Sequence, residues 1–132
     1  MPDKTYPFPK SHRLRSRPEV SAVFDAKVSD SRGPLVMYAL PNSLFHPRLA
    51  IVIGRRVGSA PRRNRIKRLV REAFRLHQHD LPAGYDFITV VRPHEPLILA
   101  EYQKLMTHLM LRLHRTWSQR GSDGGAGPKS VV

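Results

Sequence analysis

Short apolar runs bounded by turn residues alternate along the chain with stretches in which apolar residues return every three or four positions. The short runs are rich in β-branched residues and predict strands at Leu35–Leu40, Arg48–Ile53 and Asp86–Val91. The longer spacing predicts helices, one opening at Arg17-Pro18-Glu19, one from Pro61 to His77 and one from Leu97 to Trp117. This order favours the α+β class, as a small two-layer sandwich of a mostly antiparallel sheet with helices.

The connections between these elements predict which strands are neighbours. Only the turn-rich segment Pro41–Pro47 separates the first two predicted strands, so we expect these two strands to pair antiparallel. Ser29–Pro34 is predicted as a loop, although Asp25–Arg32 leaves room for one more strand. The nearly continuous apolar run of Asp86–Val91 is typical of a strand that is covered on both faces.

The last predicted helix carries a broad apolar stripe, which favours packing on the sheet over weak self-association. The stripe consists of Ile98, Tyr102, Leu105, Leu109 and Leu113, widened by Met106, Met110, Leu111 and Trp117. We predict no obligate protein partner.

Both ends of the chain lack such periodicity. Met1–Ser11 contains three prolines, and residues 118–132 are rich in Gly and Ser. Segments of this kind cannot offset the entropy lost on ordering. We therefore predict one folded domain at residues 13–117, between a disordered basic segment at 1–12 and a disordered tail at 118–132.

The charge of the chain is strongly unbalanced. Its 132 residues include 23 Lys and Arg against 10 Asp and Glu, a formal net charge of +13. Nucleic acid is the commonest polyanionic partner for such a chain, and an anionic membrane surface is the alternative. No stretch approaches the roughly 20 apolar residues of a spanning helix, and the N-terminus has no signal-peptide run, so we expect a cytoplasmic protein without membrane contact. The absence of cysteine excludes disulfides and thiolate metal sites.

The cations gather on one side of the predicted helix Pro61–His77. At about 100° per residue, the apolar side chains fall on one arc and the polar ones on the opposite arc. The apolar arc holds Ile66, Leu69, Val70, Ala73 and Phe74, and the polar arc holds Asn64, Lys67, Arg68, Arg71 and Arg75.

A charged outer face is usually only a solvated face, but two features favour a binding surface here. Glu72 is the only acid beside nine Lys and Arg in Gly54–Arg75, whereas a solvated face mixes signs to gain pairs worth about 0.2–0.5 kcal/mol each. Arg62 and Arg63 also lie in the first turn, where the helix dipole disfavours cations. A phosphate bound by free N–H groups after Gly58-Ser59-Ala60, with Arg55 and Arg56 approaching from the loop, would resolve both conflicts.

Arg63-Asn64-Arg65-Ile66-Lys67-Arg68, followed by Arg71 and Phe74, resembles the RNR signature of the bacterial ribonuclease P protein family. The likeness covers Arg13 to Arg115 and includes Arg13-Leu14, Phe24, Tyr38, Arg55-Arg56, Gly58, Tyr85-Asp86-Phe87 and Arg92-Pro93. It implies a left-handed βαβ crossover, against the general right-handed rule. It also implies binding of the catalytic RNA of ribonuclease P through Arg55, Arg56, Arg62, Arg63, Asn64, Arg65, Lys67, Arg68, Arg71 and Arg75.

The same resemblance implies a cleft between the first helix and the sheet for the 5′ leader of precursor tRNA, bounded by Arg13, Arg15, Val20, Phe24 and Tyr38. Aromatic side chains suit single-stranded RNA because stacking tolerates every base. Val20 departs from the family, which often has an aromatic residue there. Phe24 equally suits plain core packing of its helix.

The resemblance implies that the chain is a subunit of an endoribonuclease that matures the 5′ end of tRNA, with catalysis by the RNA and Mg²⁺ bound mainly through the RNA. We expect no catalytic residue, and no activity from the protein alone. The seven histidines form no recognisable pair, the ten acids form no doublet suited to a metal, and Glu72 suits pairing with Arg68 or Arg75. A ribosomal or RNA-chaperone protein without a processing role is the alternative, and a stand-alone ribonuclease is a third hypothesis.

Overall fold

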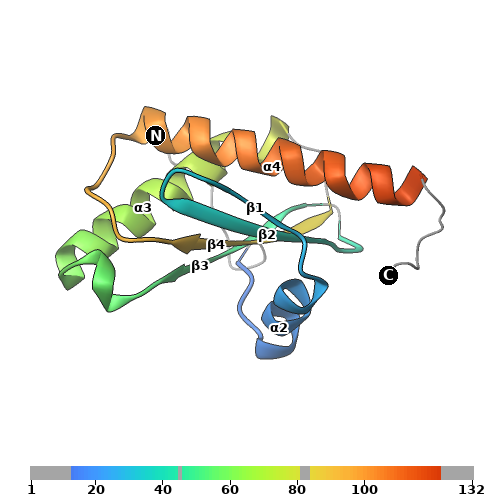
Figure 1. Cartoon of the computed structure of the whole chain (residues 1–132), viewed down its shortest axis with the longest axis horizontal. Helices are drawn as coiled ribbons and strands as arrows, with labels where there is room; N and C mark the ends of the chain where they lie inside the picture. The colour runs from blue at the N-terminus through green and yellow to red at the C-terminus, as the bar shows by residue number, and fades with distance from the viewer. Residues whose placement is uncertain (1–12, 45, 81–83, 123–132) are drawn as a thin grey trace.

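The computed structural model describes residues 13–44, 46–80 and 84–122 (Figure 1). Its helices are α2 (Arg17–Ala26), α3 (Ala60–His77) and α4 (Leu99–Ser122), with short 3₁₀ turns η2 (Arg55–Val57) and η3 (Gln78–Asp80). Its strands are β1 (Ser29–Arg32), β2 (Leu35–Pro41), β3 (Arg48–Ile53) and β4 (Tyr85–Val91). Every predicted helix and strand is present, and the α+β class is confirmed.

The four strands form one mixed sheet in the order β1-β2-β4-β3. β2 pairs antiparallel with β1 and with β4, and β3 pairs parallel with β4, so the sheet is mostly antiparallel as predicted. The predicted pairing of β2 with β3 is wrong, because β4 lies between them. β4 is the most completely buried strand, and a central place gives it neighbours on both sides and cover on both faces.

β1 is the strand that the sequence left unresolved, and the loop predicted at Ser29–Pro34 is wrong over its first four residues. Arg32 pairs with Leu35, so Gly33 and Pro34 make a tight hairpin turn. Gly33 has a φ of 57°, which a glycine adopts without strain. The residues of β1, Ser-Asp-Ser-Arg, have no apolar alternation because the strand lies at an edge of the sheet.

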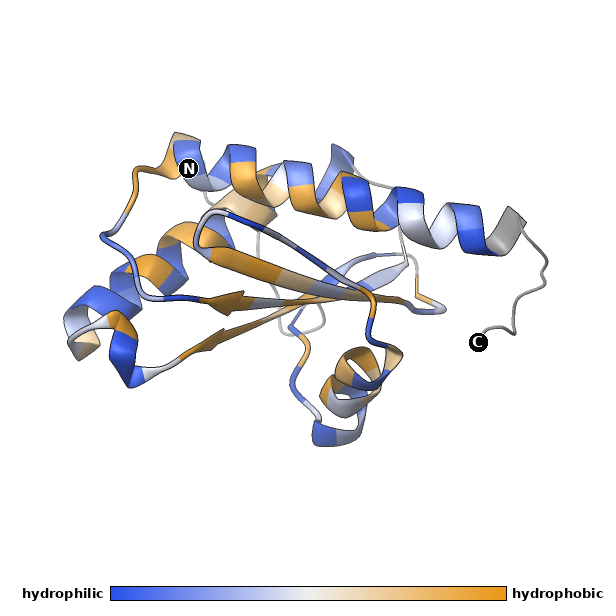
Figure 2. Cartoon of the chain, viewed as in Figure 1, coloured by the Kyte–Doolittle hydropathy of each residue, from blue (hydrophilic) through white to orange (hydrophobic). Residues whose placement is uncertain are grey.

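Helices cover both faces of the sheet. α3 and α4 lie together on one face, and α2 lies on the other (Figure 1). Figure 2 shows hydrophobic residues on the sides of α3 and α4 that face the strands. α3 connects β3 to the parallel neighbour β4, which forms the predicted βαβ unit. The hand of this crossover stays a prediction from the family resemblance.

The apolar stripe of α4 packs in the main core. Tyr102, Met106, Leu109, Met110 and Leu113 are buried there, and Leu105 and Trp117 pack against it, which confirms the core assignment. Ile98 and Leu111 are exceptions. They are 67% and 48% exposed, respectively. Ile98 precedes the first residue of α4. Leu111 lies on the side of α4 that faces away from the core.

The folded segment ends later than predicted. α4 continues through Ser122, so a disordered tail from residue 118 is wrong for residues 118–122. The predicted disorder of residues 1–12 lies outside the described residues, as does that of residues 123–132. Within the described residues, none of the helices combines the length and the apolar character needed to cross a membrane.

An ion-pair network fastens α2 to the sheet. Arg48 in β3 donates through Nε and Nη2 to the two carboxylate oxygens of Asp86 in β4, at 2.8 Å each. Its Nη1 donates to Oε2 of Glu19 in α2 at 3.0 Å. The hydrogen bonds to Asp86 are the main reason why the pKa of Arg48 is raised. This network holds α2 at a set position over the sheet.

Replacing Asp86 by asparagine is expected to lower the free energy of unfolding by about 2–3 kcal/mol, because a largely buried guanidinium loses its acid. Urea unfolding of the full chain measures the loss. Glu19→Gln is the matched control, since the Glu19 side chain is 43% exposed and an exposed pair contributes only about 0–1 kcal/mol. An equal loss in both variants would contradict this account of the network.

Candidate RNA-binding surface

α3 begins with a capped and proline-containing first turn. Ser59 accepts the N–H of Arg62 on its hydroxyl oxygen at 3.4 Å, and Pro61 follows the first helical residue. Ile66, Val70, Ala73 and Phe74 are buried against the sheet and α4, as the predicted apolar arc requires. The apolar side of α3 thereby determines which way its cations face.

Apart from Arg75, the predicted residues of α3 keep some exposure to solvent, on both flanks of the helix and on its outer side. Asn64, Arg65 and Arg68 are exposed, and Arg62, Arg63, Lys67 and Arg71 are partly buried. Arg55 and Arg56 are exposed on η2, just before the helix. The structure therefore brings nine of the ten predicted RNA-binding residues to an accessible position on one helix and its approach. Their contacts with RNA stay predictions.

Arg75 is the tenth residue, and the prediction that it is on this surface is wrong. It is only 8% exposed, and its guanidinium donates to both carboxylate oxygens of Glu72. The last turn of α3 packs against α4, where the Nε2 atoms of His77 and Gln103 are 3.1 Å apart. Glu72 is thus a helical partner, as expected, and Arg75 supports the fold.

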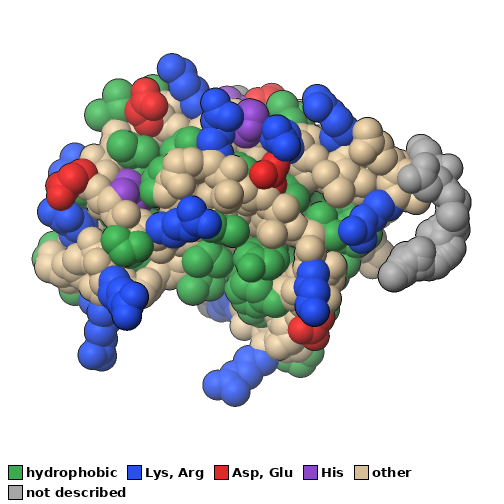
Figure 3. Space-filling model, viewed as in Figure 1, with side chains coloured by type: hydrophobic (Ala, Val, Ile, Leu, Met, Phe, Trp, Pro, Cys, Tyr) green, Lys and Arg blue, Asp and Glu red, His purple; other side chains and the backbone are tan. Residues whose placement is uncertain are grey.

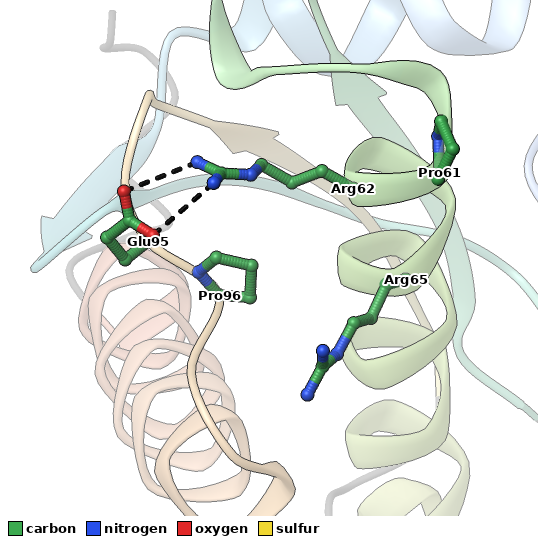
Figure 4. A pocket seen from close by; sticks show the side chains of 5 residues that line it. All are labelled: Pro61, Arg62, Arg65, Glu95 and Pro96. Atoms are coloured by element: carbon green, nitrogen blue, oxygen red, sulfur yellow. Dashed lines mark hydrogen bonds and ion pairs between the residues drawn. The ribbon is translucent and has the colours of Figure 1, made fainter.

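The start of α3 offers less room for an anion than the sequence predicted. Ser59 already occupies the N–H of Arg62, and Pro61 has no N–H. The guanidinium of Arg62 turns toward Glu95, with both N–O distances at 3.4 Å (Figure 4). Nε of Arg63 is buried and has no hydrogen-bond partner among the described residues. A phosphate held by free N–H groups and flanked by Arg62 and Arg63 is therefore not what the structure presents.

Arg62 and Arg65 border a hollow of about 400 Å³ together with Pro61, Glu95 and Pro96 (Figure 4). The Arg62 side chain passes over Gly58 on its way into this hollow, in the space that a Cβ at position 58 would occupy. Gly58 has a φ of 148°, and a Cβ at this position would lie 2.4 Å from Cδ of Arg62. A side chain at Gly58 would therefore strain the backbone and displace Arg62 at once.

Gly58→Ala is expected to lower the free energy of unfolding by about 1–3 kcal/mol through this strain. Gly54→Ala is the matched control in the same loop, because its φ is −95° and, apart from its chain neighbours, no described residue has an atom within 4 Å of an added Cβ. We expect the control to change stability by less than about 0.5 kcal/mol. Thermal and urea unfolding measure both, and similar losses would contradict the assigned role of Gly58.

A second hollow, of about 220 Å³, brings the two predicted sets of residues together. The N-terminal segment runs along the outer edge of β3, where the N–H of Leu14 donates to the carbonyl oxygen of Leu49 at 3.0 Å. This places Arg13 and Arg15, predicted for the leader, beside Lys67 and Arg71 of α3. The remaining lining residues, Leu14, Leu49, Ala50 and Ile51, are apolar.

The electrostatics of this second hollow favour an anion. Burial lowers the pKa of Arg71, and the positive charge of Arg13 lowers it further. Both causes act against the protonated guanidinium. A phosphate bound between Arg13 and Arg71 would offset both effects, because it would replace the lost hydration and reduce the repulsion between the two guanidinium groups. The hollow therefore has the chemistry of a phosphate-binding site.

Three of the residues predicted for the leader, Val20, Phe24 and Tyr38, lie where α2 packs against the sheet. Phe24 of α2 and Tyr38 of β2 meet edge to face, with ring centroids 4.8 Å apart. Both are half-buried, as is Val20, and all three pack against the small core of Leu14, Val23 and Ile88. Phe24 thus has the packing role that its spacing allowed and also a partly exposed ring.

A row of valines beside these residues was not among the predicted site residues. Val36, Val90 and Val52 form one row across β2, β4 and β3, on the same face as Tyr38. Val52 is exposed, and the other two are half-buried. Their alternation within each strand was a usable signal, but the row appears only when the strand order is known. Figure 3 shows hydrophobic side chains gathered between the sheet and α2.

The described histidines and acids do not assemble into a metal site. Nowhere in the described ranges do three His, Cys, Asp or Glu side chains come close enough to hold a metal ion. His94 contacts the Tyr102 hydroxyl at 2.7 Å, and His114 contacts that of Tyr85 at 2.8 Å. These donor groups do not fit a Mg²⁺ site. The predicted binding of Mg²⁺ through the RNA stays untested.

Comparison with known proteins agrees with this geometry. The sequence model of the family described as Ribonuclease P matches residues 8–114. The chain is 45% identical to the ribonuclease P protein component of Methylococcus capsulatus over 93 residues, which are 70% of this chain and 72% of that protein.

Solved structures agree as well. The RNase P protein of Thermotoga maritima matches with a TM-score of 0.69 and 30% identity, over 76% of this chain and 96% of that one. The RNase P protein of Staphylococcus aureus matches with a TM-score of 0.68 and 26% identity, over 80% and 96%. The chain therefore belongs to the family of ribonuclease P protein components, the protein subunits of the endoribonuclease that matures the 5′ end of tRNA.

Proposed function

We propose that the exposed side of α3, with Arg55 and Arg56, binds the phosphodiester backbone of the catalytic RNA of ribonuclease P. The cleft between α2 and the sheet binds the 5′ leader of precursor tRNA. The observation that supports both assignments is the second hollow, where Arg13 and Arg15 lie beside Lys67 and Arg71. A single junction of this kind allows the protein to hold the catalytic RNA and its substrate next to each other.

The protein acts in this proposal by binding and positioning. Cations on α3 neutralise closely spaced phosphates and release condensed counterions, which gives an affinity that falls steeply with salt. Contacts of this type fix the orientation of the RNA and carry little base specificity. Mg²⁺ belongs to the RNA here, and no step of the hydrolysis is assigned to a protein side chain.

The leader is held by stacking and by charge. The rings of Tyr38 and Phe24 offer surfaces for bases, each stacking contact contributing about 1–3 kcal/mol. Arg13 and Arg15 reach the leader phosphates at the β3 edge. When the leader is held, the scissile bond of the precursor stays longer at the active site of the catalytic RNA. The protein therefore assists cleavage by positioning the substrate. The cytoplasmic location that we propose rests on the RNA partners alone.

Reconstitution at low Mg²⁺ tests the proposal. Purified protein, catalytic RNA and precursor tRNA are mixed, and each is then omitted in turn. Cleavage at the mature 5′ end should require the catalytic RNA and improve with the protein. If the protein has no effect, a ribosomal or chaperone role is favoured. If cleavage occurs without the catalytic RNA, the protein is a ribonuclease by itself.

A further inference from the structure

A second group of cations lies at the edge of the sheet opposite to β3. Arg32 ends β1, and Lys104, Arg112, Arg115 and Arg120 project from α4, all of them exposed. Figure 3 shows Lys and Arg side chains, with a histidine among them, spread along α4 above β1. We call these five residues and His108 the β1–α4 surface.

Contacts between β1 and α4 hold this surface together. Nη1 of Arg32 is 3.2 Å from Nε2 of His108, and Nε of Arg112 donates to Oδ2 of Asp30 at 2.5 Å. Lys104, His108 and Arg112 follow one another at intervals of four, so they share one side of α4. The edge strand and the helix therefore hold Arg32, His108 and Arg112 close together.

Ordinary solvation does not explain the composition of α4. Within its described side chains, Glu101 is the one acid beside four Lys and Arg. An exposed helix normally mixes signs at intervals of three or four, because like charges at that spacing are unfavourable. Asp30 offsets only Arg112. The guanidinium of Arg120 lies over the Trp117 ring, with Cζ 5.3 Å from the ring centroid. A polyanion would offset the excess positive charge of this surface.

The strand order connects this surface to the row of valines beside the residues proposed for the leader. The apolar row runs from Val52 through Val90 to Val36, and the next residue in register is Ser31 of β1. Arg32 follows Ser31 directly. The row crosses three gaps of about 4.8 Å, so an RNA strand lying along it travels about 14 Å from the β3 edge to the β1 edge. Because the row lies on the α2 face and α4 lies on the other face, the RNA strand must then turn around the β1 edge to reach Arg32 and the cations of α4.

We propose that the β1–α4 surface binds phosphates of the distal, 5′-terminal part of the precursor's leader, beyond the nucleotides held in the cleft. This inference rests on the proposed function of the cleft. The β1–α4 surface is assigned to the precursor tRNA, because the catalytic RNA is placed on α3, near the opposite edge of the sheet. Backbone phosphates are the ligand, so binding depends on leader length and not on leader sequence.

Precursors with short and long leaders test this inference in the holoenzyme. With wild-type protein, a leader extended by about ten nucleotides should bind about 5–20-fold more tightly than a short leader, with a steeper salt dependence. The variant Arg32→Gln/Lys104→Gln/Arg115→Gln/Arg120→Gln should lose this gain. It should bind the short-leader precursor and the catalytic RNA as the wild type does. Arg112 is retained in this variant because it pairs with Asp30.

Glu101→Gln on the same helix is the control of opposite sign, expected to leave the gain intact or to increase it. The inference is overturned if wild-type holoenzyme shows no gain with leader length. It is also overturned if the fourfold variant weakens short and long leaders equally, or weakens binding of the catalytic RNA instead. The proposed function remains testable in every case through binding of the catalytic RNA and of the short leader.

Discussion

Replacing Lys67, Arg68 and Arg71 by glutamine is expected to weaken binding of the catalytic RNA about 10²–10³-fold at near-physiological salt. Each of these cations is assigned one phosphate contact. Losing three of them should reduce the slope of log affinity against log salt by about three units, and Arg68→Ala alone should reduce it by about one. Filter binding or fluorescence titration over a salt series measures both quantities.

The matched control removes the same charge from the other edge of the sheet. Lys104→Gln/Arg115→Gln/Arg120→Gln should leave affinity for the catalytic RNA and its salt slope close to those of the wild type. If both triple variants lose affinity to the same extent, binding depends on net charge alone. The assignment of the catalytic RNA to α3 would then be wrong.

Tyr38→Ala is expected to lower the affinity of the holoenzyme for precursor tRNA about 5–100-fold, because one base loses its stacking partner. Affinity for mature tRNA, which has no leader, should not change, and neither should assembly with the catalytic RNA. Competition between precursor and mature tRNA measures the discrimination directly.

Tyr38→Phe is the control for this variant, because it keeps the ring and its edge-to-face contact with Phe24. It should retain most of the preference for precursor. An equal loss for precursor and mature tRNA after Tyr38→Ala would count against a leader cleft. Such a result would indicate that Tyr38 serves only the small core beneath α2.

Local sequence patterns predicted the helices and most of the strands. They did not predict which strands pair across the sheet. The apolar arc of α3 and the β-branched run of Arg48–Ile53 are properties of short segments, and both are confirmed. The place of β4 between β2 and β3 depends on contacts between segments far apart in the chain. β1 escaped prediction because an exposed edge strand needs no apolar residues.

The candidate site shows the same division. The polar arc of α3 follows from helix geometry, and Arg75 departs from it because it is buried and paired with Glu72. The meeting of Arg13 and Arg15 with Lys67 and Arg71 could not be predicted from residues alone. It requires that the N-terminal segment runs along the outer edge of β3, which is a tertiary contact.

Site-directed crosslinking from α3 tests the central claim most directly. The chain contains no cysteine, so Asn64→Cys carries a single photoreactive group on the exposed side of α3 without removing a cation. In an active holoenzyme, this position should crosslink to the catalytic RNA, whereas the exposed loop position Ser43→Cys should not. Crosslinks from position 64 to the precursor alone, or to no RNA at all, would contradict the account.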